Sequence, residues 1–191
     1  MRELHVFENV TLDGYFTGEN GDLGWAHTRR TEGDDEWNEF VAGNASGGGT
    51  LLLGRKTYDM MKAYWPTAKA KEEAPEVAAG MNRMEKVVFS RSLDSSDWEN
   101  TRFIEGDPVA EVRKLKEQDS DGDITLLGSG SIVAQLAGAG LIDSYELVVN
   151  PVVIGKGRTL FEGVDGPLNL EPTTTRAFRN GNVLLSYEPR N

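Results

Sequence analysis

The sequence contains no cysteine among its 191 residues. Disulfide bonds, thiolate metal sites and a cysteine nucleophile are therefore excluded. It has only two histidines, His5 and His27, and neither has metal-ligand partners at a useful spacing, so we expect no metal site. No apolar run approaches the ~20 residues of a membrane span, and residues 1–7 enter a strand pattern without a signal peptide. These absences predict a cytoplasmic protein without a membrane partner.

Basic residues are also scarce. There are 20 lysines and arginines against 31 acidic residues, which gives a net charge of −11. Nucleic acids and anionic membranes need a basic binding face, so neither is an expected partner. The acidic excess by itself is typical of a soluble protein. An anionic ligand would need a local group of positive side chains, which Arg55, Lys56 and Arg91 could supply.

The length and composition predict one globular domain over residues 1–191. Hydrophobic residues make up 38% of the chain and charged residues 27%, which are ordinary values for such a domain. A chain of this length can bury one substantial core. The sequence contains no internal repeat and no linker, so we expect no second domain.

Two segments show the same pattern of a strand, a glycine and the start of a helix. Residues 51–53 precede Gly54, and residues 124–127 precede Gly128. Apolar runs of this length are typical of buried parallel strands. A glycine then allows a sharp turn into a helix, whose first N–H groups can bind a phosphate. Each glycine alone could mark a plain turn, but the two together predict a ligand with several phosphates, such as a dinucleotide.

The remaining patterns predict alternating strands and helices. The dipeptide Asn180-Gly181 is a strong hairpin signal, and Asp107-Pro108 is a good helix start. We therefore expect an α/β domain with a mostly parallel sheet and an antiparallel edge. The expected strands are 2–9, 86–90, 101–105, 144–149, 174–178 and 183–188; the expected helices are 33–41, 57–63, 108–118 and 131–138; and residues 69–84 are expected to form a mobile loop with a helical turn.

Several short motifs occur in a specific order along almost the whole chain. They are Thr11-Leu12-Asp13-Gly14, Gly54-Arg55-Lys56-Thr57-Tyr58, Val87-Val88-Phe89-Ser90-Arg91, Leu127-Gly128-Ser129-Gly130, Gly140-Leu141-Ile142-Asp143, Asn150-Pro151, Gly155-Lys156-Gly157 and Leu160-Phe161. As a set they resemble the dihydrofolate reductase-like superfamily, in the branch related to the reductase domain of riboflavin biosynthesis. The resemblance implies a mostly parallel central sheet flanked by helices, with an antiparallel C-terminal hairpin.

In that family NADPH lies across the carboxyl ends of the parallel strands, as is general for open α/β sheets. The resemblance implies that the two glycine turns hold the phosphates, that Ser90 and Arg91 contact the 2′-phosphate, and that the end of the first strand lies beside the nicotinamide. The loop at Thr17 and Gly18 would cover it. The cofactor-binding residues implied in this way are Asn9, Val10, Thr11, Thr17, Gly18, Gly54, Arg55, Lys56, Thr57, Ser90, Arg91, Gly128, Ser129, Gly130, Ser131 and Ile132.

The resemblance implies NADPH-dependent reduction of a small heterocycle. The activity would be similar to that of 5-amino-6-(5-phosphoribosylamino)uracil reductase or dihydrofolate reductase. The chain departs from the family at its substrate end. Ser129 replaces the second of two adjacent glycines, and Leu126 stands where the riboflavin reductases commonly carry an acidic residue. The zinc deaminase to which those reductases are often fused has no counterpart here. The alternative is therefore a non-catalytic dinucleotide-binding module with the same fold.

Two acidic residues are candidates for the catalytic carboxylate. Glu36 lies in an acidic helix at the place where dihydrofolate reductases keep their substrate carboxylate, and with Trp37 and Phe40 it could line a substrate cleft. Acidic residues in the first turn of a helix are also ordinary capping chemistry. Asp13 is the second candidate, although an aspartate before glycine commonly shapes a turn.

The C-terminal hairpin predicts self-association. Residues 183–187 are apolar on more than one face and would form an exposed edge, and such edges favour pairing with another chain. The loop at 151–163 adds apolar surface. A twofold homodimer would bury both, and the family resemblance also implies a dimer. The alternative is that a neighbouring helix covers the hairpin within one chain.

Overall fold

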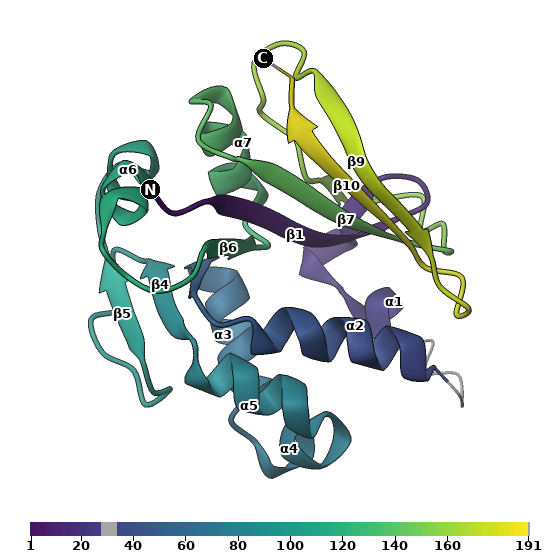
Figure 1. Cartoon of the computed structure of the whole chain (residues 1–191), viewed down its shortest axis with the longest axis horizontal. Coiled ribbons are helices and arrows are strands. Elements are labelled where there is room, and N and C mark those ends of the chain that lie inside the picture. Colours follow the sequence, from purple (N-terminus) through teal and green to yellow (C-terminus); the bar gives the residue numbers. More distant parts are fainter. Residues whose placement is uncertain (28–33, 191) are drawn as a thin grey trace.

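The computed structural model describes residues 1–27 and 34–190, which form an eight-stranded sheet with helices on both faces (Figure 1). The strand order is β5-β4-β3-β6-β1-β7-β10-β9. The sheet strands are β1 (Leu4–Thr11), β3 (Thr50–Gly54), β4 (Glu85–Phe89), β5 (Thr101–Ile104), β6 (Ile124–Leu127), β7 (Ser144–Asn150), β9 (Leu170–Ala177) and β10 (Val183–Pro189); β2 (Tyr15–Thr17) and β8 (Arg158–Thr159) form a separate pair. The helices are α1 (Gly24–His27), α2 (Asp35–Ser46), α3 (Arg55–Tyr64), α4 (Ala68–Glu73), α5 (Pro75–Arg83), α6 (Pro108–Glu117) and α7 (Gly130–Gly138).

The six strands from β5 to β7 pair in parallel, and β10 runs antiparallel to both β7 and β9. The predicted α/β class, with a mostly parallel sheet and an antiparallel C-terminal hairpin, is therefore confirmed. In the described ranges no helix has both the length and the apolar character needed to cross a membrane.

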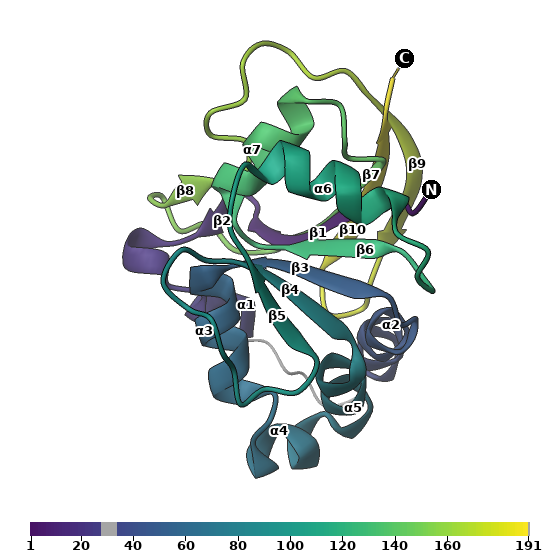
Figure 2. The ribbon, with the colours of Figure 1, turned by 90° about the vertical axis from the view of Figure 1, so that its left-hand side faces the viewer.

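The helices lie in two layers, with α6 and α7 on one face and α2, α3, α4 and α5 on the other (Figure 2). Strand β3 shows why its sequence is uniformly apolar. The side chain of Leu52 packs in the core under α6 and α7, while Leu51 and Leu53 pack in the core under α2, α3 and α5. A strand that is buried on both faces has no polar alternation.

The chain path changes direction at the carboxyl ends of β1 and β6. These two strands are neighbours in the sheet, but α2 follows β1 on one face and α7 follows β6 on the opposite face. Open α/β sheets bind ligands at such a switch in direction. Because β6 pairs with β1 only as far as Phe7, the last part of β1 is free of β6.

The prediction of a mobile loop at 69–84 is wrong, because this segment forms α4 and α5. The Thr67 hydroxyl accepts a hydrogen bond from Ala70 N (3.2 Å) and caps α4, and Pro75 occupies the first turn of α5. Helix α5 packs so closely on α2 that a Cβ at Gly80 would lie 2.2 Å from the Ala45 oxygen. Helix α5 forms because its apolar side chains pack against α2, and the charged residues of the segment lie on its exposed side.

Two other helices differ at their ends. Helix α2 does not stop at Gly43 but continues to Ser46. Gly43 does not adopt the left-handed conformation that would end a helix. Helix α3 begins directly after Gly54, two residues earlier than expected.

The hairpin forms the end of the sheet, but the expectation that residues 183–187 are its exposed edge is wrong. These residues belong to β10, which lies between β7 and β9, and Leu184 and Ser186 are buried. The edge strand is β9, whose exposed side chains are mostly polar. In the 151–163 loop Leu160 is buried, whereas Val153 is 64% exposed.

Candidate active site

The two glycine turns lie side by side at the carboxyl edge of the sheet. Leu53 of β3 is in register with Leu127 of β6, so the turns that follow them meet. The backbone N–H of Gly54 donates a hydrogen bond to Ser129 Oγ (2.8 Å). A Cβ at Gly54 would lie 2.2 Å from the same oxygen, so only glycine allows this contact.

Gly128 and Ser129 are both left-handed, with φ values of +62° and +61°. A Cβ at Gly128 would lie 2.5 Å from Thr57 Oγ1, and Thr57 Oγ1 lies 3.4 Å from Ser129 Oγ. A left-handed serine is strained by about 1–2 kcal/mol. Strain of this kind is retained where the surrounding structure holds it and is concentrated at functional sites.

The N-termini of α3 and α7 point into this edge without a side-chain cap. Within the described ranges, neither Gly54 nor Ser129 caps its own helix through a side-chain hydrogen bond. Two positive helix ends are thus brought close together by the pairing of β3 with β6. An anion placed between them would relieve their repulsion and bind their free N–H groups.

Positive side chains lie beside the two helix ends. The Arg55 guanidinium donates to Ser92 Oγ and contacts Asp59 Oδ2 at 3.5 Å. Ser90 is buried, and its hydroxyl accepts hydrogen bonds from the backbone of the next turn, including Leu93 N at 3.1 Å. Arg91 is exposed, as is Lys56, and neither forms an ion pair with another described residue. The structure therefore gathers these predicted residues where β3 and β4 end.

Val10 and Thr11, at the end of β1, are buried. Asn150 Nδ2 donates to Asn9 Oδ1 (3.1 Å), which fixes the Asn9 side chain. Beyond β1, Thr17 pairs with Arg158. Gly18, the next residue, donates a hydrogen bond from its N–H to the Asp22 oxygen (2.8 Å). The roles of these residues toward a nicotinamide stay predictions.

Asp13 holds a loop at the same edge. Its carboxylate accepts hydrogen bonds from Gly155 N (2.8 Å) and Ile154 N (3.4 Å). A hydrogen bond from the Thr11 side chain, together with these N–H groups, holds the Asp13 pKa below its usual range. The carboxylate therefore joins the end of β1 to the loop after β7. Its catalytic role stays a prediction.

The predicted substrate residues of α2 pack against the sheet. Trp37 and Phe40 form an aromatic cluster with Phe178, with ring centroids 5.1 Å from it. Glu36 Oε1 forms an ion pair with Arg176 Nη2 (2.9 Å). These contacts give all three residues a structural partner, and their roles toward a substrate stay predictions.

Two acidic residues at this edge were missed by the sequence analysis. Asp34, directly before α2, is only 8% exposed, and neither of its carboxylate oxygens bonds to another described residue. Helix α2 begins on the side of the molecule where β1 ends (Figure 1). Glu8 is the second. It could have been noticed in the sequence, because it is a charged residue at a position where the alternating residues Leu4, Val6 and Val10 are apolar.

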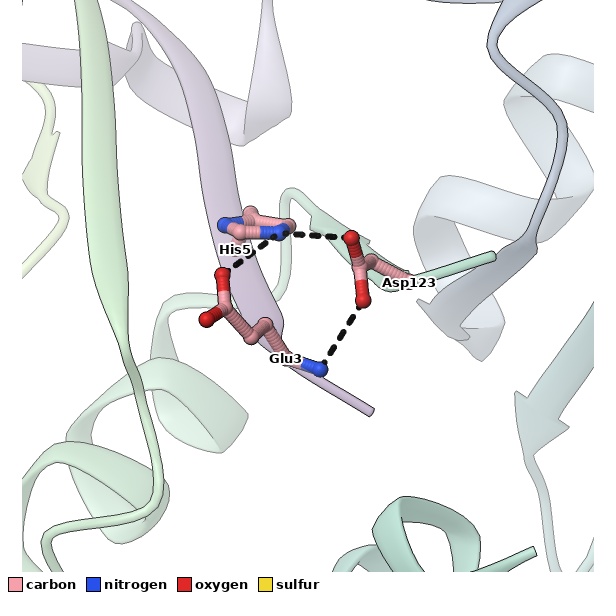
Figure 3. Close-up of side chains that lie close together, drawn as sticks. All are labelled: Glu3, His5 and Asp123. Atoms are coloured by element: carbon pink, nitrogen blue, oxygen red, sulfur yellow. Dashed lines mark hydrogen bonds and ion pairs between the residues drawn. The ribbon is translucent and has the colours of Figure 1, made fainter. Parts of the chain in front are cut away.

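A different polar cluster occupies the opposite edge, where the strands begin. The Nε2 atom of His5 lies 3.6 Å from Asp123 Oδ2 and 3.8 Å from Glu3 Oε2 (Figure 3). Its Nδ1 atom lies 2.7 Å from Ser144 Oγ. The sequence spacing shows no metal-ligand partner for His5, and it is the pairing of β1 with β6 that brings Asp123 to it. Both carboxylates are more than half exposed, and the contacts connect the starts of β1, β6 and β7.

The fold and this edge define an α/β domain in which two uncapped helix N-termini meet at the carboxyl ends of parallel strands. The family described as RibD C-terminal domain matches residues 2–184, and the chain belongs to that family. The chain is 32% identical over 178 residues to the uncharacterized protein YyaP of Bacillus subtilis, covering 93% of this chain and 90% of that protein.

Solved structures show the same fold. A putative riboflavin biosynthesis protein from Shewanella sp. PV-4 superposes with a TM-score of 0.74 at 18% identity, over 100% of both chains. Dihydrofolate reductase from Enterococcus faecalis, complexed with NADP(H) and RAB-propyl, superposes with a TM-score of 0.62 at 18% identity, over 99% of this chain and 97% of that chain. The predicted dihydrofolate reductase-like fold is confirmed.

Proposed function

We propose that this protein is an NADPH-dependent reductase of a small heterocyclic substrate. The observation that carries the proposal is the meeting of two uncapped helix N-termini beside Arg55 at the carboxyl edge of the sheet. When bound, NADPH supplies a hydride. The residues of the chain would bind the phosphates of NADPH, orient its nicotinamide and exclude water from this edge of the sheet. Membership of the RibD C-terminal domain family supports the same activity.

The donor set fits a phosphorylated dinucleotide. The turns at Gly54 and Ser129 would bind the pyrophosphate through backbone N–H groups, with the positive ends of α3 and α7 behind them. Ser90 and Arg91, at the end of β4, would bind the 2′-phosphate, since a guanidinium binds phosphate oxygens in pairs. Asn9 would lie beside the nicotinamide.

The direct test is titration of the protein with NADPH, followed by quenching of tryptophan fluorescence. Saturable binding is expected, and an absence of binding below roughly millimolar NADPH would contradict the proposal. Turnover is then sought by NADPH oxidation across a panel of pterins, flavin precursors and carbonyl compounds. Binding without oxidation of any of them would support the dinucleotide-binding module instead.

Arg91→Ala is expected to weaken NADPH binding tenfold or more and to leave NADH binding nearly unchanged. A charge-assisted hydrogen bond to a phosphate is worth about 1.5–3 kcal/mol, and NADH lacks the 2′-phosphate. Fluorescence titration with both cofactors measures the difference. Arg113→Ala, which removes another exposed arginine on α6, is the control. Equal losses for both cofactors would show that Arg91 does not recognise the 2′-phosphate.

A carboxylate in or just before the first turn of α2 is the candidate contact for the substrate. Asp34→Asn is expected to lower kcat tenfold or more without changing NADPH affinity, because its buried oxygens have no bond to another described residue. Glu36→Gln is the comparison, because Glu36 is paired with Arg176. A larger loss of kcat in Glu36→Gln than in Asp34→Asn would restore Glu36 as the catalytic candidate.

We also expect a twofold homodimer. With β10 inside the sheet, the surface available for pairing is the edge strand β9 together with the exposed apolar side chains at the site edge, such as Val153 and Leu12. Light scattering after size exclusion measures the mass in solution. A mass near that of one chain, 21.0 kDa, would contradict this expectation.

A further inference from the structure

Glu8 is a half-buried acid beside the turn at Gly128. It follows Leu4 and Val6 on the face of β1 that packs under α6 and α7, and its register partner in β7 is Leu147. Because β6 ends at Leu127, the residue beside Glu8 on the other flank is Gly128 itself. A carboxyl group in this row of apolar side chains is therefore next to the start of α7.

The Glu8 carboxyl group has few partners. Its Oε1 atom accepts a hydrogen bond from Asn9 N (3.1 Å). Its Oε2 atom is closed off from solvent and has no hydrogen-bond partner among residues 1–27 and 34–190. Burial raises the Glu8 pKa to about 8, and the backbone N–H groups of Asn9 and Gly128 only partly oppose this effect. At pH 7 this shift favours the protonated, neutral form of the group.

Few charges face Glu8 from the elements packed on this side of the sheet. Helix α7 has no charged residue, and neither has β2. On α6 the buried Lys116 is paired with Asp143, whose carboxylate is bonded to the start of β1. On β7, Tyr145 lies on the same face as Glu8, and burial raises its pKa to about 12. The segment between β7 and β9 carries Lys156, Arg158 and Glu162 near the site edge, and Arg158 is paired with Glu162. Glu146 of β7 alternates to the opposite face of the sheet from Leu147. Thus the ionisation of Glu8 would add a negative charge at the start of α7, where the phosphates are proposed to bind.

We propose that Glu8 is a binding determinant of the dinucleotide site, and that the phosphates bind at the α7 N-terminus only while Glu8 keeps its proton. This inference rests on the proposed NADPH site. A neutral Glu8 leaves the positive end of α7 and the turn at Gly128 available to the ligand. An ionised Glu8 would oppose the phosphates through a region of low dielectric constant, where charges interact strongly.

The direction of the pH effect follows from linkage. The free protein loses the Glu8 proton as the pH rises through about 8, and a bound phosphate raises this pKa further because like charges disfavour ionisation. NADPH affinity should therefore fall about sevenfold or more between pH 7 and pH 9.5, as expected for a pKa that rises by at least one unit on binding. At pH 8.5 the protein should take up protons when NADPH binds.

The test compares the wild-type protein with Glu8→Gln, which keeps the shape but cannot ionise. Isothermal titration calorimetry in buffers of different ionisation enthalpy measures affinity and proton uptake together. In Glu8→Gln the affinity should change less than about threefold between pH 7 and pH 9.5, without the proton uptake at pH 8.5. Glu146→Gln is the matched control, since Glu146 faces away from the turn, and it should behave as the wild type.

Another group that titrates in this range is Lys86, whose pKa is lowered by burial to about 8. It lies near the start of β4, at the edge of the sheet opposite the site, and it remains in every variant. Its contribution therefore cancels in the comparison. If Glu8→Gln folds poorly, carbon-13 NMR of the glutamate carboxyl groups in the wild-type protein shows directly whether NADPH raises the Glu8 pKa.

The outcomes separate this inference from the proposed function. NADPH binding that is independent of pH, or that keeps its pH dependence in Glu8→Gln, would overturn the role of Glu8 and leave the reductase proposal intact. An unchanged Glu8 pKa on NADPH binding would do the same. An absence of NADPH binding to the wild-type protein even at pH 6.5 would overturn both.

Discussion

Gly54→Ala is expected to weaken NADPH binding about a hundredfold or more. The added Cβ would lie 2.2 Å from Ser129 Oγ and 3.0 Å from Ser129 Cβ, so the start of α7 must move away from the start of α3. Ser129 is held in a left-handed conformation and cannot move without displacing the turn. When two helix N-termini bind the same ligand, the affinity for the ligand depends on the distance between them. A change in that distance weakens the contacts at both ends and removes most of the affinity.

Fluorescence titration with NADPH measures this loss, with thermal unfolding as the check on the fold. Gly138→Ala is the matched control, because a Cβ at Gly138 in α7 meets nothing within 4 Å. That variant should bind NADPH like the wild type. A Gly54→Ala protein with unchanged NADPH affinity would show that the contact between the two turns does not form the binding site.

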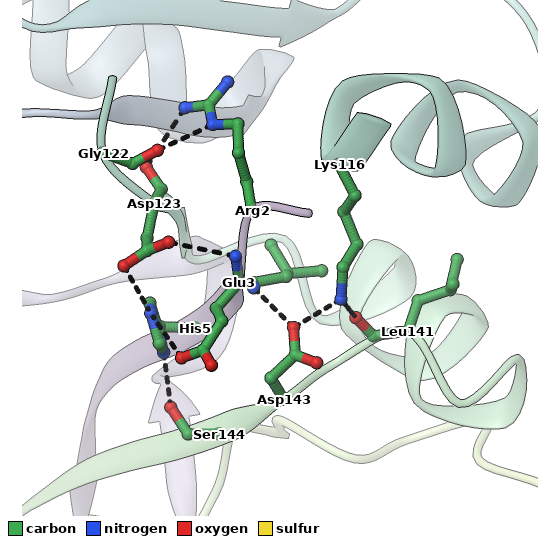
Figure 4. A network of polar contacts seen from close by, with 10 residues as sticks. Arg2, Glu3, His5, Lys116, Gly122, Asp123, Leu141, Asp143 and Ser144 are labelled. Carbon is green, nitrogen blue, oxygen red and sulfur yellow. Dashed lines mark hydrogen bonds and ion pairs between the residues drawn. The ribbon is translucent and has the colours of Figure 1, made fainter. Parts of the chain in front are cut away.

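Asp143→Ala is expected to lower the free energy of unfolding by about 1–3 kcal/mol, the cost of leaving buried donors without their acceptor. Lys116 is buried, whereas the Asp143 side chain is 40% exposed. The buried Lys116 ammonium donates to the Asp143 carboxylate and to the Leu141 oxygen (3.0 Å), and Leu4 N donates to Asp143 Oδ2 (2.6 Å) (Figure 4). Removing the carboxylate leaves Lys116 with a buried charge and Leu4 with an unbonded N–H group.

Urea denaturation measures the change in stability. Glu111→Gln, which breaks the exposed ion pair with Lys114, is the control and should cost less than about 1 kcal/mol. The double variant Asp143→Ala with Lys116→Met should recover part of the loss, because it removes the unpaired charge. A loss in Asp143→Ala no greater than that in Glu111→Gln would show that Lys116 is solvated rather than dependent on Asp143.

The elements predicted most accurately are those whose sequence signals are local. Gly54 and Gly128 each mark the end of a buried strand and the start of a helix, and the chain needs no distant information to form such a turn. Asp107 caps α6 through Ala110 N (2.8 Å), as its position before Pro108 predicts. In contrast, residues 69–84 carry charges on the exposed side and alanines on the buried side, and the resulting helices depend on packing against α2.

In the candidate site, the residues proposed to bind through their backbone were predictable, and those proposed to act through their side chains were less so. The residues at Gly54 and Gly128 follow from the strand pattern together with the family resemblance. Asp34 and Glu8 do not, because burial is a property of the assembled sheet and the same residue types at a helix start or in a strand are commonly exposed. Similarly, the partner of Glu36 is Arg176 of β9, which the sequence could not indicate.

The first strand of the chain occupies the middle of the sheet. Strand β1 has β6 and β7 as its two neighbours, so Leu4 pairs with Ile124 and His5 with Ser144. During synthesis β1 therefore has no partner until most of the chain has left the ribosome. Closing such long loops early is entropically costly, which slows folding. A chain truncated before residue 144 would leave this strand unpaired on one side and is expected to aggregate rather than fold.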